Sequence, residues 1–116
     1  MSYDLNFWQY EDNVYLDNQD VYEKLSNGEL VEGVVNIPVS EILKRLKDYF
    51  SDGWEQLDEL NWESEKGAFQ IFTTQQLFRV DCYDMDGEEM NKVIDIANEF
   101  HLPLYDPQVG KRYDGR

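Results

Sequence analysis

The sequence predicts an α+β fold of the ferredoxin-like, split βαβ type: a four-stranded antiparallel sheet with two main helices on one face and a short extra helix. Two segments carry apolar residues at three- and four-residue steps, as amphipathic helices do, and four segments are of strand type. In chain order these segments are 3–8, 39–50, 67–73, 76–82, 90–100 and 102–105. Because 116 residues is the length of one domain, we expect a single domain over 1–116.

The N-terminal part of the chain is predicted to hold a strand and a short helix. Residues 3–8 alternate between two sides with the period of a half-buried strand. Asn18 can cap a short helix over 19–26, and Gly28 lies just past its end. For 29–36, a strand and an ordered loop are equally arguable.

The middle of the chain is predicted to hold a long helix and an acidic connection. Pro38 suits the first turn of this helix, because its missing N–H would have no partner there. The helix should end near Gly53. The stretch that follows, 54–66, is interpreted as a long acidic connection with a helical turn around 57–60.

The C-terminal half is predicted to hold a hairpin, a second long helix and a last strand. Segments 67–73 and 76–82 flank a short polar break and predict a β-hairpin. Asp86 and Glu89 have the spacing of a capping box, which predicts the start of the helix. Pro103 ends that helix before the last short strand. With both long helices on one face, the other face of the sheet is expected to be open.

Two aromatic residues, Trp8 and Phe72, are expected on this open face. Exposed aromatic rings on such a sheet can stack nucleic-acid bases. Proteins that do so surround the rings with Lys and Arg, whereas this chain would repel phosphates. Cover by the acidic connection or by a partner is therefore the favoured interpretation.

Charge narrows the classes of partner. Ten Lys and Arg against 25 Asp and Glu give a net charge of −15, which disfavours binding to nucleic acid and to anionic membranes. No apolar stretch approaches the roughly 20 residues that cross a bilayer. Cys82 is the single cysteine, and the start has neither a basic segment nor an apolar run, so a cytoplasmic location is expected.

No catalytic, cofactor or metal site is predicted. The oxygen-rich run 84–89 does not fit a calcium loop, because EF-hand spacing would place Cys82 and Val93 at ligand positions. A packed thiol at Cys82 and a helix-terminal His101 are favoured over a catalytic Cys–His pair. Nucleotide-binding and zinc motifs are absent from the sequence, and we expect a protein that is not an enzyme and takes no cofactor.

The predicted partner-binding site is the acidic connection, where tryptophans lie among acids. Its residues are Asp52, Trp54, Glu55, Asp58, Glu59, Trp62 and Glu63. A basic protein would relieve the repulsion among the acids, and the tryptophans would be desolvated anchors or else core residues. The open sheet face around Asp4, Asn6 and Arg79 is the alternative binding surface.

The two ends of the chain resemble the ends of a group of bacterial proteins. The start SYDLNFW and the end LPLYDPQVG resemble a group of small, mostly uncharacterised bacterial proteins that begin M-S-Y-D-L and close with Y-D-P-Q or F-D-P-Q. The segments between them lie in the order found in that group. The short helix and the acidic connection are the variable parts.

In size, charge and general character the chain also resembles the immunity proteins of contact-dependent inhibition and related polymorphic-toxin systems. Those proteins neutralise a toxic nuclease domain by occluding it. The resemblance implies a non-catalytic antitoxin that binds a basic toxin, an RNase or DNase domain. The alternative is a structural or regulatory protein-interaction module that has no toxin as its partner.

Overall fold

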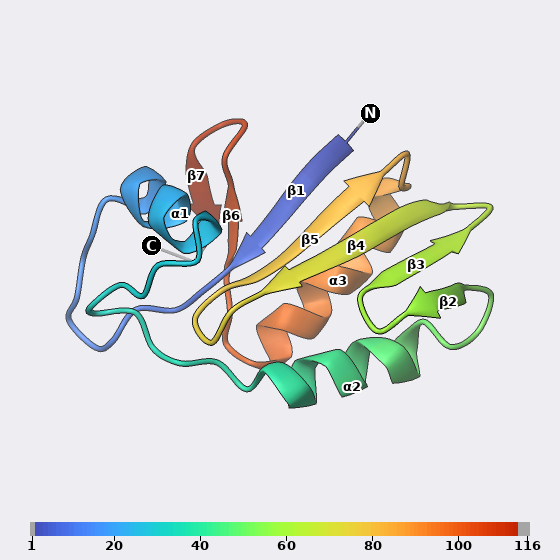
Figure 1. Ribbon diagram of the computed structural model, residues 1–116. Helices are drawn as coiled ribbons and strands as arrows, with labels where there is room; N and C mark the ends of the chain where they lie inside the picture. The colour runs from blue at the N-terminus through green and yellow to red at the C-terminus, as the bar shows by residue number, and fades with distance from the viewer. Residues whose placement is uncertain (1, 114–116) are drawn as a thin grey trace.

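The computed structural model describes residues 2–113, which form one seven-stranded antiparallel sheet and three helices (Figure 1). The strands occur in the spatial order β2-β3-β4-β5-β1-β6-β7. In chain order the elements are β1 (Ser2–Phe7), α1 (Asn18–Ser26), α2 (Val39–Tyr49), β2 (Glu55–Asp58), β3 (Asn61–Ser64), β4 (Gly67–Thr73), β5 (Phe78–Tyr83), α3 (Gly87–Glu99), β6 (Leu104–Asp106) and β7 (Lys111–Tyr113).

The predicted four-stranded sheet with two main helices is wrong, although the α+β class agrees with the structure. The predicted strands are present and adjacent, as β4-β5-β1-β6. Strands β2 and β3 extend the sheet at one edge and β7 extends it at the other. No helix within residues 2–113 has the length and apolar character needed to cross a membrane.

The acidic connection, 54–66, is a β-hairpin and has no helical turn. Strands β2 and β3 pair with each other, and Glu59 and Leu60 form the turn between them. The side chain of Asp58 fixes this turn by accepting hydrogen bonds from the backbone N–H of Leu60 at 2.8 Å and from the side chain of Asn61. A short, charged edge strand has little apolar alternation, so its sequence resembles a loop.

The two long helices cover one face of the sheet, as predicted. Apolar residues of α2 and α3 pack against the inward-facing residues of β1, β4 and β5 in one cluster. At the start of α3, the predicted capping box does not form, because the Asp86 side chain makes no capping hydrogen bond. Glu89 is buried instead and forms ion pairs with Lys66 and Lys92 at 3.1 and 2.7 Å.

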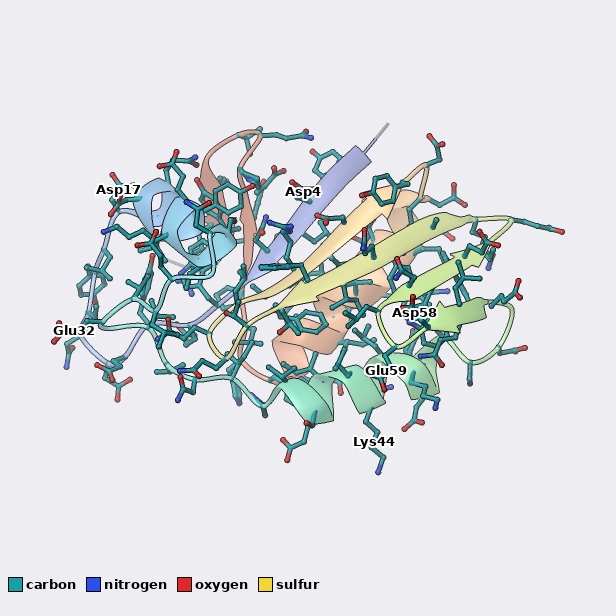
Figure 2. All side chains as sticks on the ribbon, in the orientation of Figure 1. Asp4, Asp17, Glu32, Lys44, Asp58 and Glu59 are labelled. Atoms are coloured by element: carbon teal, nitrogen blue, oxygen red, sulfur yellow. The ribbon has the colours of Figure 1, made fainter. Side chains whose placement is uncertain are left out.

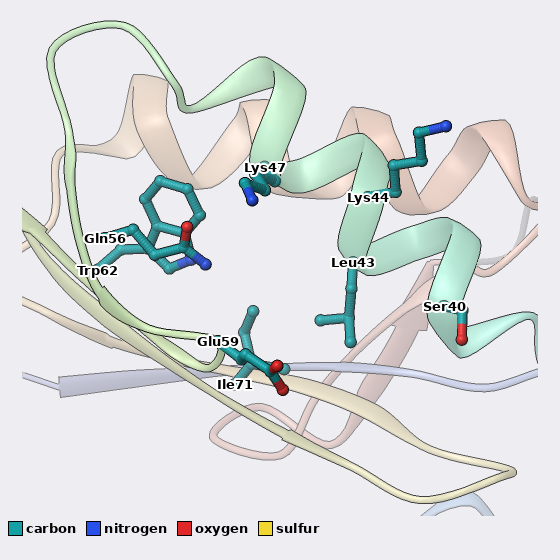
Figure 3. A pocket seen from close by; sticks show the side chains of 8 residues that line it. All are labelled: Ser40, Leu43, Lys44, Lys47, Gln56, Glu59, Trp62 and Ile71. Carbon is teal, nitrogen blue, oxygen red and sulfur yellow. The ribbon is translucent and has the colours of Figure 1, made fainter.

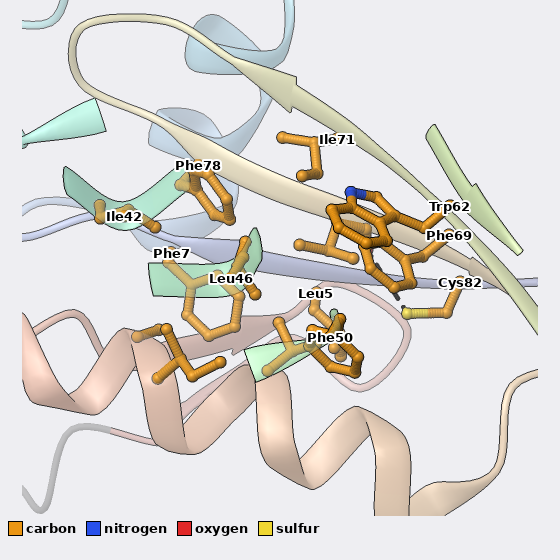
Figure 4. Packing of buried hydrophobic residues seen from close by; sticks show 14 of the residues in the cluster. Leu5, Phe7, Ile42, Leu46, Phe50, Trp62, Phe69, Ile71, Phe78 and Cys82 are labelled. Carbon is orange, nitrogen blue, oxygen red and sulfur yellow. Dashed lines mark hydrogen bonds between the residues drawn. The ribbon is translucent and has the colours of Figure 1, made fainter. Parts of the chain in front are cut away.

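Phe69 of β4 joins three other aromatic rings of the main core, part of which Figure 4 shows. The Phe69 ring lies 5.2 Å from the ring of Phe50, 5.2 Å from that of Trp54 and 6.0 Å from that of Trp62. Aromatic pairs at such distances add stability beyond the area that they bury. The hairpin β2–β3 is therefore attached to the rest of the protein through Trp62 as well as through backbone pairing.

The opposite face of the sheet is covered at one end only, by α1 and the loops beside it. Val21 and Leu25 of α1 pack on Trp8 and Tyr105, and Trp8 is fully buried. The helix is capped by Asp17, one residue before the predicted Asn18.

Residues 29–36 form a loop that joins this cover. They form no strand, and the loop is joined to residues 9–11 by an isolated bridge between Tyr10 and Val34 and by neighbouring backbone hydrogen bonds. The Gln76 side-chain amide donates hydrogen bonds to the carbonyls of Val34 and Val31, and its oxygen accepts one from the backbone N–H of Val31. The prediction of an open face is thus wrong at this end, where Trp8 has no surface for a nucleic-acid base.

Replacing Phe69→Ala should lower the free energy of unfolding by about 3–5 kcal/mol, because the change leaves a cavity among three aromatic rings. Urea denaturation with a two-state fit measures it. The control is Leu57→Ala, an exposed position at which a loss under about 0.5 kcal/mol is expected. Equal losses in the two variants would contradict the tight packing of Phe69 among these rings.

Candidate protein-binding face

The uncovered end of the sheet carries a continuous polar surface. Cross-strand pairing places one residue from each of five strands in a row, which we call the polar row. From β2 to β1 the polar row consists of Asp58, Asn61, Gln70, Asp81 and Asp4, and Figure 2 labels its two ends. Strand alternation turns these residues away from the face that α2 and α3 cover.

Two pairs of acids lie directly opposite each other on this surface. Asp4 of β1 pairs with Asp81 of β5, and Glu55 of β2 pairs with Glu63 of β3. Like charges in such positions destabilise a sheet. Arg79 offsets part of this repulsion, because its Nε lies 3.2 Å from the carboxylate of Asp81. The other pair has both side chains exposed to solvent.

The acids of the polar row have different protonation behaviour. Burial raises the pKa of Asp81 to about 6, the hydrogen bond and the charge of Asp4 add to the rise, and Arg79 opposes it. Hydrogen bonds from the side chain of Asn61 and the backbone of Leu60 lower the pKa of Asp58. The face therefore gains negative charge at Asp81 as the pH rises through about 6.

The structure divides the predicted site residues among four places, of which the core, for the two tryptophans, is the fourth. Glu55 and Glu63 face the same side as the polar row, to which Asp58 belongs. Asp52 is exposed in the loop that follows α2. Glu59, in the turn of the hairpin, lies on the side that faces α2 (Figure 2).

The two tryptophans of the predicted site belong to the core. Trp54 is 9% exposed and Trp62 is 4% exposed, and both pack on Phe69. Their location matches the core alternative of the sequence analysis and leaves little ring surface for a protein partner. Tyr83 is better placed: it is 44% exposed and lies opposite Ala68, in the sheet row next to the polar row.

The alternative surface, around Asp4, Asn6 and Arg79, is continuous with the hairpin acids. Asn61 and Gln70 connect the two in the polar row. Asn6 itself is fully buried and offers no contact surface. The sequence analysis treated these surfaces as separate, because it did not identify β2 and β3 as strands that extend the sheet.

The residues considered for catalysis lie elsewhere. Cys82 is buried in the main core, and burial raises the pKa of its thiol to about 12. His101 follows the end of α3, and its backbone carbonyl accepts a hydrogen bond from the side chain of Gln9. Within residues 2–113, no three His, Cys, Asp or Glu side chains are grouped so that they could hold a metal ion.

Replacing Asp4→Asn should lower the pKa of Asp81 and raise stability at neutral pH. A folded-state pKa of about 6 lies above the unfolded value of about 3.9, so the free energy of unfolding falls as the pH rises from about 4 to about 6. The substitution removes part of this loss while keeping the Arg79 ion pair, and we expect a gain of about 1 kcal/mol at pH 7.

The measurement is a carboxyl NMR titration of Asp81 together with urea denaturation at about pH 4.5 and about pH 7. These two pH values lie on either side of the pKa of about 6. Asp95→Asn, on the exposed side of α3, is the matched control. An Asp81 titration unchanged by Asp4→Asn would show that the two carboxyl groups do not interact.

Comparisons with protein-family models, curated proteins and solved structures give no match for the chain. The resemblance to the small bacterial proteins and to immunity proteins therefore stays a prediction from the sequence. The polar row and its neighbours, through their charge, shape and chemistry, are the features of the molecule that bear on function.

Proposed function

We propose that the chain is a non-catalytic immunity protein, which binds a basic bacterial nuclease toxin in the cytoplasm and keeps nucleic acid away from it. The observation that carries this proposal is the two pairs of like-charged cross-strand neighbours, Asp4 with Asp81 and Glu55 with Glu63, on the sheet face opposite α2 and α3. Glu55 and Glu63 are exposed there, and Asp4 and Asp81 are partly exposed. The contacts weaken the isolated sheet, and a cationic partner would remove that repulsion.

The chemistry of the face suits the surface that a nuclease uses for nucleic acid. Arg and Lys side chains that bind phosphates also bind carboxylates, and an Arg guanidinium can hold a carboxylate through two hydrogen bonds. Carboxylates on adjacent strands would bind the same Arg and Lys side chains of the toxin that the nucleic acid needs. The toxin would then be neutralised by competition for its basic surface.

The shape of the face supports a protein partner. It is the surface of an antiparallel sheet, and its acids and amides are spread over five strands. Tyr83 adds an exposed aromatic side chain beside them. An aromatic residue beside polar groups is the composition that protein interfaces favour.

The net charge of −15 supports the same proposal through association kinetics. A field of one sign speeds the encounter with a basic protein, and salt screens this effect over about 8–10 Å. The acids on the hairpin and on β1 and β5 give this general attraction a defined place on the surface.

The test uses the product of the gene immediately upstream, expressed with and without this chain. We expect that product to stop bacterial growth and this chain to restore it. A product that is harmless, or toxic despite the chain, would contradict the immunity function and favour the regulatory or structural module.

The double replacement Glu55→Lys and Glu63→Lys tests the binding face. It should slow association with the upstream product about tenfold at low salt. The control, Glu41→Lys with Asp95→Lys, makes the same charge change at exposed positions of α2 and α3. If both variants slow association equally, only net charge matters and the face has no specific role.

A further inference from the structure

A pocket of about 320 Å³ lies between α2 and the hairpin β2–β3, on the side of the hairpin away from the polar row (Figure 3). This volume is at the lower end of the range for small-molecule sites. Its apolar lining comes from three elements: Leu43 of α2, Trp62 of β3 and Ile71 of β4. Trp62 and Ile71 are buried core residues, so this part of the pocket is rigid and preformed.

The polar lining of the pocket is rich in hydrogen-bond donors. Lys44 and Lys47 contribute from α2 and Gln56 from β2, and Glu59 stands on the opposite wall. In Figure 3 the ammonium group of Lys47 and the amide of Gln56 point toward the hollow between helix and hairpin. The ammonium group of Lys44 points away from the hollow, so Lys47 and Gln56 are the donors that face it.

The lysines have no carboxylate partner within residues 2–113. Glu41 and Asp48 stand three and four positions from Lys44 on the same helix, where ion pairs commonly form, yet no pair is made. Glu59 does not pair with them either. In a chain with 25 acids, an unpaired lysine that faces a hollow, as Lys47 does, indicates a place where an anion from outside can bind.

We propose that this pocket binds a small organic monocarboxylate, with its ring or branched apolar group on Trp62 and Ile71 and its carboxylate held by Lys47 and Gln56. A cation would be repelled by the Lys47 ammonium group. A polyanion would meet Glu59 and the field of the whole chain, whose net charge is −15. A neutral apolar molecule would leave the Lys47 ammonium group without an anionic partner.

The proposal is independent of the proposed function. Strand alternation places Gln56 and Trp62 on one side of the hairpin and Glu55 and Glu63 on the other. Failure of one proposal therefore leaves the other standing.

The probe is 3-phenylpropionate, whose single ring and single carboxylate match the two parts of the pocket. We expect saturable shifts of the Trp62 indole N–H signal in NMR titrations, with a dissociation constant of ~1 mM, because a ligand of this size makes few contacts. The neutral 3-phenylpropionamide should bind at least about fivefold more weakly, because it lacks the charge that Lys47 binds.

Two variants of exposed residues test the polar contacts. Lys47→Gln should weaken binding about fivefold, and Glu59→Gln should strengthen it, because the latter removes a repelling carboxylate. The control Lys24→Gln makes the same charge change as Lys47→Gln on α1 and should leave the affinity unchanged within about twofold.

Three outcomes would overturn the proposal. They are equal binding of the acid and the amide, equal weakening by Lys47→Gln and Lys24→Gln, and shifts that do not saturate at Trp62. Urea denaturation of each variant establishes that the fold is retained.

Discussion

The antiparallel pairing of β1 with β5 is the constraint on which both the core and the candidate face depend. Its register places Leu5 opposite Val80 on the side that the long helices cover, and both are buried. The same register places Asp4 opposite Asp81 on the other side. A slip of one residue would turn the acids into the core, so the burial of the apolar pair holds the two carboxyl groups together.

The cover provided by α1 defines where the acidic face begins. Arg79 marks the boundary, because its guanidinium lies over the ring of Phe72 at 4.6 Å and its Nε also pairs with Asp81. On the α1 side, Trp8 and Tyr105 are buried. On the other side, the polar row crosses five strands and no helix packs over it. Repulsion among its acids destabilises the sheet, and the packing of the aromatic core on the opposite face offsets that repulsion.

Sequence patterns predicted the elements whose side chains repeat over several turns or along whole strands. The amphipathic periods identified α2 and α3, and alternation identified β1, β4 and β5. The hairpin β2–β3 was missed because its position depends on pairing with β4 and on Trp62 entering the core. A tryptophan among acids suits an interface and a core equally well, and only the contact with Phe69 distinguishes them. The candidate face was predicted in two halves for the same reason.

The hairpin shows how four-residue strands can present two different chemistries. Glu55 and Glu63 carry negative charge on one side, while Gln56 and Trp62 form a wall of the pocket on the other. Strand β2 pairs with β3 alone, so it has fewer backbone partners than the strands of the sheet interior. A molecule bound on either side would therefore contact a strand pair whose position depends on Trp62. Both surfaces require that the Trp62 ring stays packed in the core.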